Sequence, residues 1–377
     1  MQPYEFRMPA VLRVGVGTHR LIPDEVSRLG ARRLLVVSDR NCAAIPEVAA
    51  TVDALRARVE ALELFVDVPG EPTDVEVENG LEALRRSGAQ AVLGIGGGAV
   101  LDTAKAIAAM AANSGRIVDY MGRDKFTQPR LPLVLAPTTA GTGSEATRYT
   151  VITDAATDVK MLITDWKLLP DVAIVDPRLV VGSPPKVTAS SGVDALTHAI
   201  EAYVSQRRQP TADMFALGAI RQLYPNLLPA FRDGSDLDAR TQTLIGALHA
   251  GIAFCNSSVA LVHGMSRPIG AHFHVAHGLS NSMLLPAVTA WSLEAAHDRY
   301  RDVALAMGLS SERDLPAALE QLAKDLEIPR LGQVVEPARV RAAAPQMAAD
   351  ALASGSPQNN PRVPNETEIV ELYERCL

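Results

Sequence analysis

The sequence predicts an α/β N-terminal domain with a parallel sheet, followed by an all-helical C-terminal domain. Up to about residue 180, short aliphatic runs alternate with helical patterns, as expected for a parallel sheet with helices on both faces. Beyond that point strand-like runs vanish, and apolar or amphipathic segments are punctuated by prolines. Gly182-Ser183-Pro184-Pro185 separates the two patterns and favours a hinge, so we expect domains at 1–181 and 182–377.

Each expected element of the first half is a short run with a recognisable period. The expected strands cover residues 10–16, 33–38, 62–66, 91–95, 131–136 and 172–175. The expected helices cover residues 22–29, 46–60, 75–87 and 101–112. In the second half, residues 241–266 contain no charged side chain and are long enough to span a bilayer. Because polar residues such as His249 and Asn256 are spaced along this segment, we expect one or two helices buried in a domain core.

Composition excludes several classes of protein. The chain has 377 residues, of which 47% are hydrophobic, so disordered and mini-protein classes are excluded. A net charge of −7 gives no electrostatic support for binding nucleic acid. Cys42, Cys255 and Cys376 are widely spaced and include no CxxC, which favours neither a disulfide framework nor a thiolate zinc site. The N-terminus has no apolar signal-peptide region, and we expect a cytoplasmic protein.

A glycine turn follows the expected strand at 91–95. Gly96, Gly97, Gly98 and Ala99 allow backbone amides to approach a pyrophosphate closely, and the following helix N-terminus favours negative charge. With Gly94 they also satisfy the G-x-G-x-x-A pattern of dinucleotide-binding turns. A plain turn is the open alternative. Asp102 and Lys105, in the first turns of the helix, either reach a ribose or phosphate or simply lie on an exposed helix face.

A second loop and an acidic residue add to the nucleotide interpretation. Residues 138–144 hold four hydroxyl side chains and two glycines after a strand, which suits a polar ligand. Thr142 or Ser144 could instead cap a helix. Asp39 follows the strand at 33–37, where it would accept hydrogen bonds from a ribose hydroxyl and favour NAD over NADP, unless it caps the next helix.

The histidines suggest a metal site. Asp194 and His198 are four residues apart in a helical pattern and therefore share one helix face. Ser191 as a helix cap, with a buried core histidine, is the alternative. Six of the eight histidines lie between 198 and 277, and His263 and His277 both precede glycine. Three imidazoles and one carboxylate would suit Fe²⁺ or Zn²⁺ and leave a coordination position open.

Taken together, the motifs resemble the iron-containing (group III) alcohol dehydrogenases, from about residue 10 to Asn360-Pro361-Arg362. The motifs are Gly96-Gly97-Gly98-Ala99 with Asp102 and Lys105, the run from Pro137 to Glu145, Asp194 with His198 and Glu201, and His263-Gly264 followed by His277-Gly278. The resemblance implies an enzyme that uses NAD and Fe²⁺, or Zn²⁺, to transfer hydride between a small alcohol and an aldehyde or ketone. It also implies a homodimer. From the charge and composition we expect neither a nucleic-acid nor a membrane partner.

The same resemblance implies the site residues. The implied metal ligands are Asp194, His198, His263 and His277. The residues implied to bind the dinucleotide in the N-terminal domain are Asp39, Gly96, Gly97, Gly98, Ala99, Asp102, Thr138, Thr139, Thr142, Lys160 and Leu179.

One position departs from the family's pattern. Many members carry a proton-relay histidine four residues after the equivalent of His263, whereas this chain has Arg267, which cannot act as a base at pH 7. The relay then falls to His272, to His274 or to water. Arg267 either binds an anionic substrate tail, such as that of an ω-hydroxy acid or semialdehyde, or pairs with a nearby acid. We therefore name His263, His277, Arg267 and His274 as the expected catalytic residues.

Other reactions remain open at this stage. A hydroxyacid–oxoacid transhydrogenase would turn over without releasing NADH. A lyase of the dehydroquinate-synthase type shares the implied fold and metal, and would use NAD only transiently. Accumulation of NADH with a simple alcohol distinguishes an alcohol dehydrogenase from both.

Overall fold

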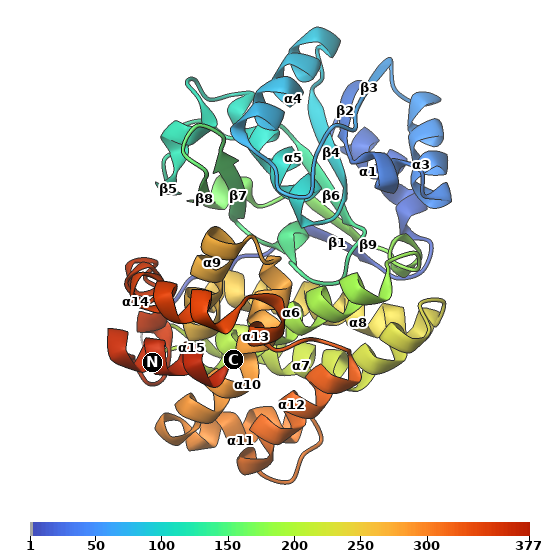
Figure 1. Cartoon of the computed structure of the whole chain (residues 1–377). Helices are drawn as coiled ribbons and strands as arrows, with labels where there is room; N and C mark the ends of the chain where they lie inside the picture. The colour runs from blue at the N-terminus through green and yellow to red at the C-terminus, as the bar shows by residue number, and fades with distance from the viewer. Residues whose placement is uncertain (1–2) are drawn as a thin grey trace. The chain divides into compact units, whose positions relative to one another are not determined.

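The computed structural model describes residues 3–377, which fold as two compact units (Figure 1). We call Met8–Thr139 with Gly143–Ser183 the α/β unit. The helical unit comprises Pro184–Leu377, Ala140–Thr142 and an N-terminal segment that ends at Arg7. The predicted fold class, a parallel α/β part followed by a helical part, is confirmed.

A six-stranded, fully parallel sheet forms the centre of the α/β unit, in the order β1-β9-β6-β4-β2-β3. Its strands are β1 (Val11–Val14), β2 (Arg33–Val37), β3 (Ala61–Phe65), β4 (Ala91–Gly96), β6 (Leu133–Pro137) and β9 (Val172–Val175). These match the six expected strands closely. Strands buried on both faces read as continuous aliphatic runs, which is why the sequence revealed them.

Helices cover both faces of this sheet, as Figure 1 shows. On one face α1 (Ile22–Arg28) and α3 (Pro46–Arg56) pack with Leu34 and Val36 of β2. On the other face α4 (Asp74–Ser87) and α5 (Gly98–Met110) pack with Leu35 and Val37. The side chains of a strand alternate between faces, so each face receives one set of aliphatic residues. A short helix, α2 (Arg40–Ala43), follows β2.

A small second sheet was absent from the predicted elements. It has the strand order β5-β8-β7, with β5 (Gly122–Arg123), β7 (Tyr149–Asp154) and β8 (Val159–Thr164). β7 and β8 form an antiparallel hairpin in which Thr150 and Ile152 are buried while Val151 is exposed. This alternation of buried and exposed residues is typical of a strand with one exposed face, which gives a weaker sequence pattern than a fully buried strand.

The helical unit contains ten helices of at least four residues in the described chain. They are α6 (Pro185–Val204), α7 (Pro210–Arg232), α8 (Leu237–Ser257), α9 (Leu261–Phe273), α10 (His277–Ser292), α11 (His297–Ala306), α12 (Leu315–Asp325), α13 (Leu331–Val334), α14 (Pro337–Ala353) and α15 (Glu366–Arg375). The uncharged segment 241–266 forms parts of α8 and α9, which confirms the expectation of buried helices.

Taken singly, the helices of the described residues differ from membrane-spanning helices. No single helix combines the length and apolar composition that crossing a bilayer requires. Only α8 and α9 taken together satisfy those criteria, and they are bent by 101° at their junction.

Candidate metal centre and cofactor site

Helix α6 carries the first two predicted ligands on one buried face. Because it begins at Pro185, Ser191 lies inside the helix and donates its hydroxyl hydrogen bond to a backbone carbonyl one turn earlier. The alternative in which Ser191 caps the helix is therefore wrong. Asp194 and His198 are both buried and one turn apart, as the spacing predicted.

Helices α9 and α10 bring two imidazoles to Asp194. His263 lies in the first turn of α9, and its Nε2 is 3.7 Å from Asp194 Oδ1. His277 is the first residue of α10 and the exposed member of the group. One ligand atom from each of the three residues lies within 4.8 Å of the other two. We call Asp194, His263 and His277 the ligand cluster.

His198 lies beside the ligand cluster in a stack of rings. Its ring centroid is 4.5 Å from that of His263 and 4.2 Å from that of Phe254, with both pairs nearly parallel. The Nδ1 atom is buried and has no hydrogen-bond partner among residues 3–377. Desolvation, with a smaller contribution from the charge of Arg267, lowers the pKa of His198 well below its usual range. Its role as a fourth ligand stays a prediction.

The donor set fits a divalent transition metal. Although His277 is exposed as a whole residue, desolvation of its imidazole lowers the pKa of His277 to about 3, against the opposing charge of Asp194. The ring is therefore neutral at pH 7 and keeps a lone pair for coordination. Neutral imidazoles with one carboxylate are donors that suit Fe²⁺ and Zn²⁺. A cation would also compensate the buried charge of Asp194 and the unpartnered nitrogen of His198.

Two further residues contact the ligand cluster. Glu201 Oε2 accepts a hydrogen bond from His263 Nδ1 at 2.6 Å. Asn281 Nδ2 lies 2.6 Å from Asp194 Oδ1, 3.1 Å from His263 Nε2 and 3.2 Å from His277 Nε2. Glu201 belongs to one of the family motifs without a predicted role, and no motif includes Asn281. The available signal was helical spacing, since Asn281 follows His277 by one turn.

Arg267 follows His263 by one turn of α9. Its Nη1 donates to Ser356 Oγ at 2.9 Å. The positive charge of Arg267 also contributes to the lowered pKa of both His198 and His277. The guanidinium is therefore near enough to act electrostatically on the ligand cluster.

The two proposed relay histidines lie at the end of the same helix. His274 follows α9 with a left-handed backbone (φ 54°) and is exposed. His272 is also exposed, and its Nε2 lies 3.3 Å from Asp350 Oδ2. In the described chain, no hydrogen bond or ring contact joins either residue to the ligand cluster. The proton-relay role of His272 and His274 therefore stays a prediction.

In the α/β unit, the glycine turn lies where the strand order reverses. β2 pairs with β3 on one side and β4 on the other, and nucleotides typically bind at the carboxyl ends of such strands. Helix α5 begins at Gly98, directly after Gly97, without a side-chain cap, so its first N–H groups are available to an anion. At Gly96 a Cβ would lie 2.5 Å from Val100 Cβ, so glycine is required there. These features fit the phosphate role predicted for Gly96, Gly97, Gly98 and Ala99.

Asp39 and Thr138 lie at the same edge of the sheet. Asp39 caps α2, because its Oδ1 accepts the N–H groups of Asn41 and Cys42, each at 2.9 Å. The capping interpretation is therefore correct, and a contact with ribose remains a prediction. Thr138 donates its N–H to the Gly96 carbonyl at 2.9 Å, and its Oγ1 lies 3.2 Å from Cys42 Sγ.

Lys105 faces the interior of the α/β unit. It is fully buried, and its Nζ donates to Ser144 Oγ (2.8 Å), Thr147 Oγ1 (3.1 Å) and the Tyr149 carbonyl (2.8 Å). Asp102 accepts from Ser144 Oγ at 2.6 Å and from a backbone N–H of β7 at 2.8 Å. The expectation that Lys105 lies on an exposed helix face is wrong, because the side chain is fully buried. Its hydrogen bonds join α5 to residues 144–149, which argues against a contact with a ribose or phosphate. For Asp102, a cofactor contact stays a prediction.

The other predicted cofactor residues have different surroundings. Lys160, on β8, pairs with Glu71 at an Nζ–Oε1 distance of 2.6 Å. Leu179 is buried in the core cluster beneath α1 and α3. Thr139 belongs to the α/β unit and Thr142 to the segment grouped with the helical unit. Their roles toward the dinucleotide stay predictions.

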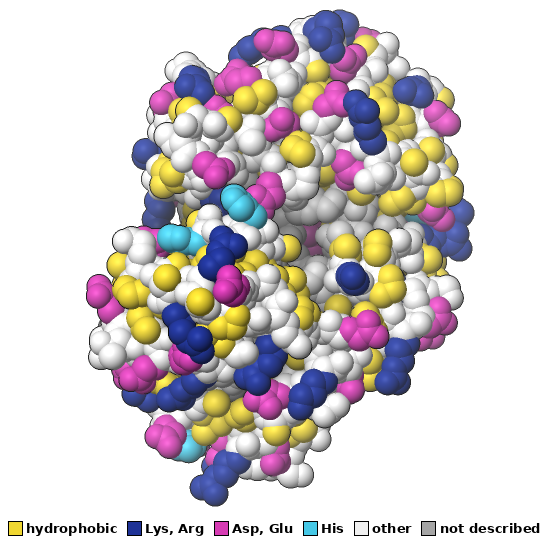
Figure 2. All heavy atoms as spheres, viewed as in Figure 1, with side chains coloured by type: hydrophobic (Ala, Val, Ile, Leu, Met, Phe, Trp, Pro, Cys, Tyr) yellow, Lys and Arg dark blue, Asp and Glu magenta, His cyan; other side chains and the backbone are white. Residues whose placement is uncertain are grey.

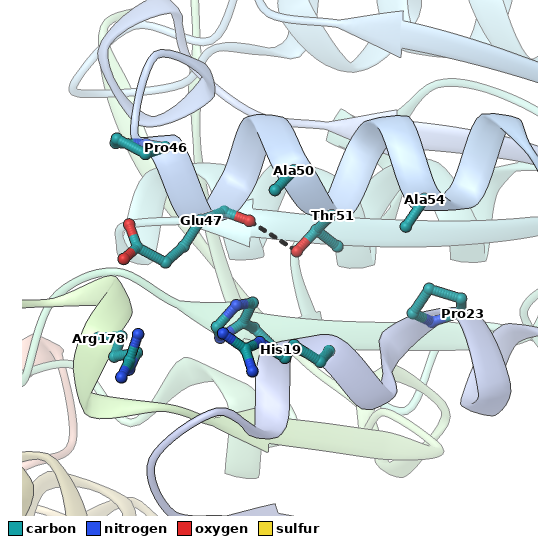
Figure 3. Close-up of a pocket in the computed structure, with 9 residues that line it drawn as sticks. His19, Pro23, Pro46, Glu47, Ala50, Thr51, Ala54 and Arg178 are labelled. Carbon is teal, nitrogen blue, oxygen red and sulfur yellow. Dashed lines mark hydrogen bonds between the residues drawn. The ribbon is translucent and has the colours of Figure 1, made fainter.

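A surface pocket of about 290 Å³ lies between α1 and α3 (Figure 3). His19, Glu47 and Arg178 are among the residues that line it, and no predicted metal or cofactor residue does. His19 Nδ1 lies 2.5 Å from Asp176 Oδ2, so the ring is held in place by the segment after β9. This pocket therefore does not coincide with the predicted metal site or the predicted cofactor site.

The α/β unit has a parallel sheet with a glycine turn before an uncapped helix N-terminus, and the helical unit has a cluster of histidines and an aspartate. These two features are typical of a metal-dependent oxidoreductase that uses a nucleotide cofactor. The chain belongs to the iron-containing alcohol dehydrogenase family. Residues 9–177 match the family model "Iron-containing alcohol dehydrogenase", and residues 188–377 match "Fe-containing alcohol dehydrogenase family, C-terminal".

Individual relatives agree over the full length. The chain is 35% identical to a 1,3-propanediol dehydrogenase of Klebsiella pneumoniae over 385 residues, covering 99% of each. It is 35% identical to an NAD-dependent methanol dehydrogenase of Bacillus methanolicus over 388 residues, again covering 99% of each. A crystal structure of 1,3-propanediol oxidoreductase superposes with a TM-score of 0.96 at 34% identity, covering 100% of both chains.

These findings confirm the resemblance drawn from the motifs. The chain is an enzyme of the alcohol dehydrogenase class and therefore an oxidoreductase. The predicted cofactors agree with the family, which is iron-containing and includes an NAD-dependent member among the relatives above.

Proposed function

We propose that this protein catalyses the reversible oxidation of a small primary alcohol to its aldehyde, with NAD as hydride acceptor and Fe²⁺ as resident metal. The observation that carries the proposal is the convergence of Asp194, His263 and His277 from three helices to within 4.8 Å. A donor set of this kind has no structural purpose among well-packed apolar helices, and it suits Fe²⁺ or Zn²⁺.

The residues of the helical unit hold and surround the metal. Asp194, His198, His263 and His277 are the four ligands in this proposal. When bound, such a metal supplies Lewis acidity, which lowers the pKa of a hydroxyl and polarises a carbonyl. The buried apolar residues around His198 and His263 exclude water on that side of the site, which strengthens electrostatic interactions there.

The dinucleotide is proposed to bind at the carboxyl edge of the sheet. Its pyrophosphate would accept hydrogen bonds from the first turn of α5, at Gly97 to Ala99. Asp39 would accept a ribose hydroxyl and repel a 2′-phosphate, which favours NAD over NADP. The remaining residues of this proposed subsite are Asp102, Thr138, Thr139, Thr142, Lys160 and Leu179.

Arg267 is proposed to select the substrate. Its guanidinium adds a positive charge near His198 and His277, in addition to that of the metal. A substrate with a carboxylate or other anionic tail would balance this charge and form a charge-assisted hydrogen bond. We therefore propose ω-hydroxy acids or their semialdehydes as the favoured class. Proton transfer in this scheme uses His274 or water, because Arg267 cannot accept a proton.

The broader context follows from the same reasoning. We propose a dinucleotide-binding domain at 1–181, a metal and substrate domain at 182–377, and a homodimer in the cytoplasm. On the face drawn in Figure 2, basic and acidic side chains are interspersed, and no basic patch suggests a nucleic-acid partner there.

The test is a direct assay of purified protein reconstituted with Fe²⁺. We expect NADH to accumulate with NAD and a panel of primary alcohols, diols and ω-hydroxy acids, and to stop accumulating after chelation. Turnover of a hydroxyacid and oxoacid pair without released NADH would favour a transhydrogenase instead. A His277→Ala protein, which should bind NAD normally but lose metal and turnover, is the matched control.

A further inference from the structure

Glu201 is a buried carboxylate whose two oxygens accept three hydrogen bonds. Oε2 accepts from the Ala260 N–H at 2.9 Å and from His263 Nδ1 at 2.6 Å, and Oε1 accepts from the Val262 N–H at 2.5 Å. The residue is only 3% exposed. A buried carboxylate requires such saturation, because an unpaired charge in the core is strongly destabilising. Each donor belongs to the start of α9 or to the residue preceding it.

One of these bonds determines which ring nitrogen of His263 carries hydrogen. A carboxylate only accepts hydrogen bonds, so Nδ1 must be the donor and the neutral ring keeps its lone pair on Nε2. Nε2 is the atom that lies 3.7 Å from Asp194 Oδ1, on the side of the ligand cluster. Glu201 thus selects the tautomer in which His263 can coordinate a metal.

The other two imidazoles near the cluster are held differently. His277 Nδ1 lies 3.2 Å from Ser266 Oγ, and Ser266 Oγ lies 2.6 Å from Ser280 Oγ. The Ser280 hydroxyl donates a hydrogen bond to the His277 carbonyl, so the side-chain partners of His277 in this network are neutral hydroxyl groups. His198 Nδ1 has no hydrogen-bond partner in the described chain. Of the Nδ1 contacts described for these three histidines, the one between His263 and Glu201 involves a carboxylate. Hydrogen bonds to charged groups are about twice as strong as neutral ones.

We propose that Glu201 is a positioning residue of the metal centre, which holds His263 in the Nδ1–H tautomer and ties that ligand to the start of α9. The proposal rests on the proposed metal-dependent function. Because Glu201 lies one turn beyond His198 on α6, the helix that also carries Asp194, it links ligands of two helices. Hydrogen bonds of this kind to metal-binding histidines typically change metal affinity 10–100-fold when removed.

The first experiment needs no substitution. Metal-free protein labelled with ¹⁵N-histidine is studied by NMR at neutral pH, and the His263 resonances are assigned by comparison with His263→Ala. We expect the hydrogen of His263 on Nδ1. A ring protonated on Nε2 alone, or an even mixture of tautomers, would overturn the proposal whether or not any Glu201 variant folds.

The second experiment separates positioning from helix capping. Glu201→Gln keeps the shape but turns an NH₂ group toward at least one donor. We measure Zn²⁺ affinity by competition with a chromophoric chelator in the wild-type and His263→Ala backgrounds. The expected loss is about 10–100-fold in the wild-type background and less than about threefold when His263 is absent. Equal losses in both backgrounds would show that Glu201 acts only on the fold.

A matched control removes a helix cap that touches no ligand. Asp236 caps α8 in the same unit by accepting the Ala239 N–H at 2.9 Å. Asp236→Ala should lower stability yet leave Zn²⁺ affinity within about twofold, since caps contribute about 1 kcal/mol to stability alone. Zn²⁺ binding and the tautomer do not depend on the substrate. A negative alcohol assay therefore does not contradict the proposed role of Glu201, and a negative result for Glu201 does not contradict the proposed alcohol dehydrogenase activity.

Discussion

Replacement of Lys105 by methionine tests whether this buried lysine stabilises the α/β unit or binds the cofactor. The ammonium group donates three hydrogen bonds, to Ser144, Thr147 and Tyr149, and lies 3.9 Å from Asp102 Oδ1. Methionine preserves the approximate length of the side chain but removes the three donated hydrogen bonds and the charge that opposes the raised pKa of Asp102.

The expected cost follows from burial. Removing one partner of a buried charged network typically destabilises a protein by about 3–5 kcal/mol. For a unit of this size, we expect the melting temperature of the Lys105→Met protein to fall by at least about 6 °C. The matched control is Lys160→Met. Its ammonium pairs with Glu71 on the surface, so its loss should cost less than about 1 kcal/mol.

The assay combines urea and thermal unfolding with NAD titration of the folded proteins at low temperature. We expect Lys105→Met to lose stability with little loss of NAD affinity, and Lys160→Met to lose NAD affinity with little loss of stability. The reverse pattern, in which Lys105→Met is stable but binds NAD poorly, would refute the assignment of Lys105 to the core.

Three other predictions concern single residues. Asp39→Gly should raise kcat/KM with NADP relative to NAD by an amount equivalent to about 1–3 kcal/mol, and a wild-type preference for NADP would contradict this. Arg267→Leu should raise KM for an ω-hydroxy acid, at a cost of about 1.5–3 kcal/mol, while a neutral alcohol of equal length is barely affected; equal losses would make Arg267 structural. Burial raises the pKa of Glu145 to about 7 in the folded protein. The contribution of the protonated side chain to the free energy of unfolding is therefore fully present below about pH 4.5 and is lost as the pH rises through about 7. Glu145→Gln should therefore match the wild-type free energy of unfolding at pH 4.5 and exceed it by up to about 3 kcal/mol at pH 8, and a constant difference between the two pH values would contradict this.

Much of the architecture could be predicted because local patterns carry it. Strands β2, β4 and β9 are continuous aliphatic runs, which only a sheet buried on both faces requires. The hairpin of β7 and β8 was not predicted, since its half-exposed strands leave a weaker signal. The motifs named the candidate ligand residues, and the helical period placed Asp194 and His198 on one face of a helix.

The sequence by itself determined the two kinds of domain, the glycine turn at a strand end and the residue types that suit a metal. Only the tertiary structure decided which side chains meet. It showed that His263 and His277 lie close to Asp194, that Glu201 is hydrogen-bonded to His263, and that Lys105 is buried in the core. The physical reason is that secondary structure follows from neighbours within a few residues. A contact between α6, α9 and α10 depends instead on how whole helices pack and on which buried polar groups must find partners.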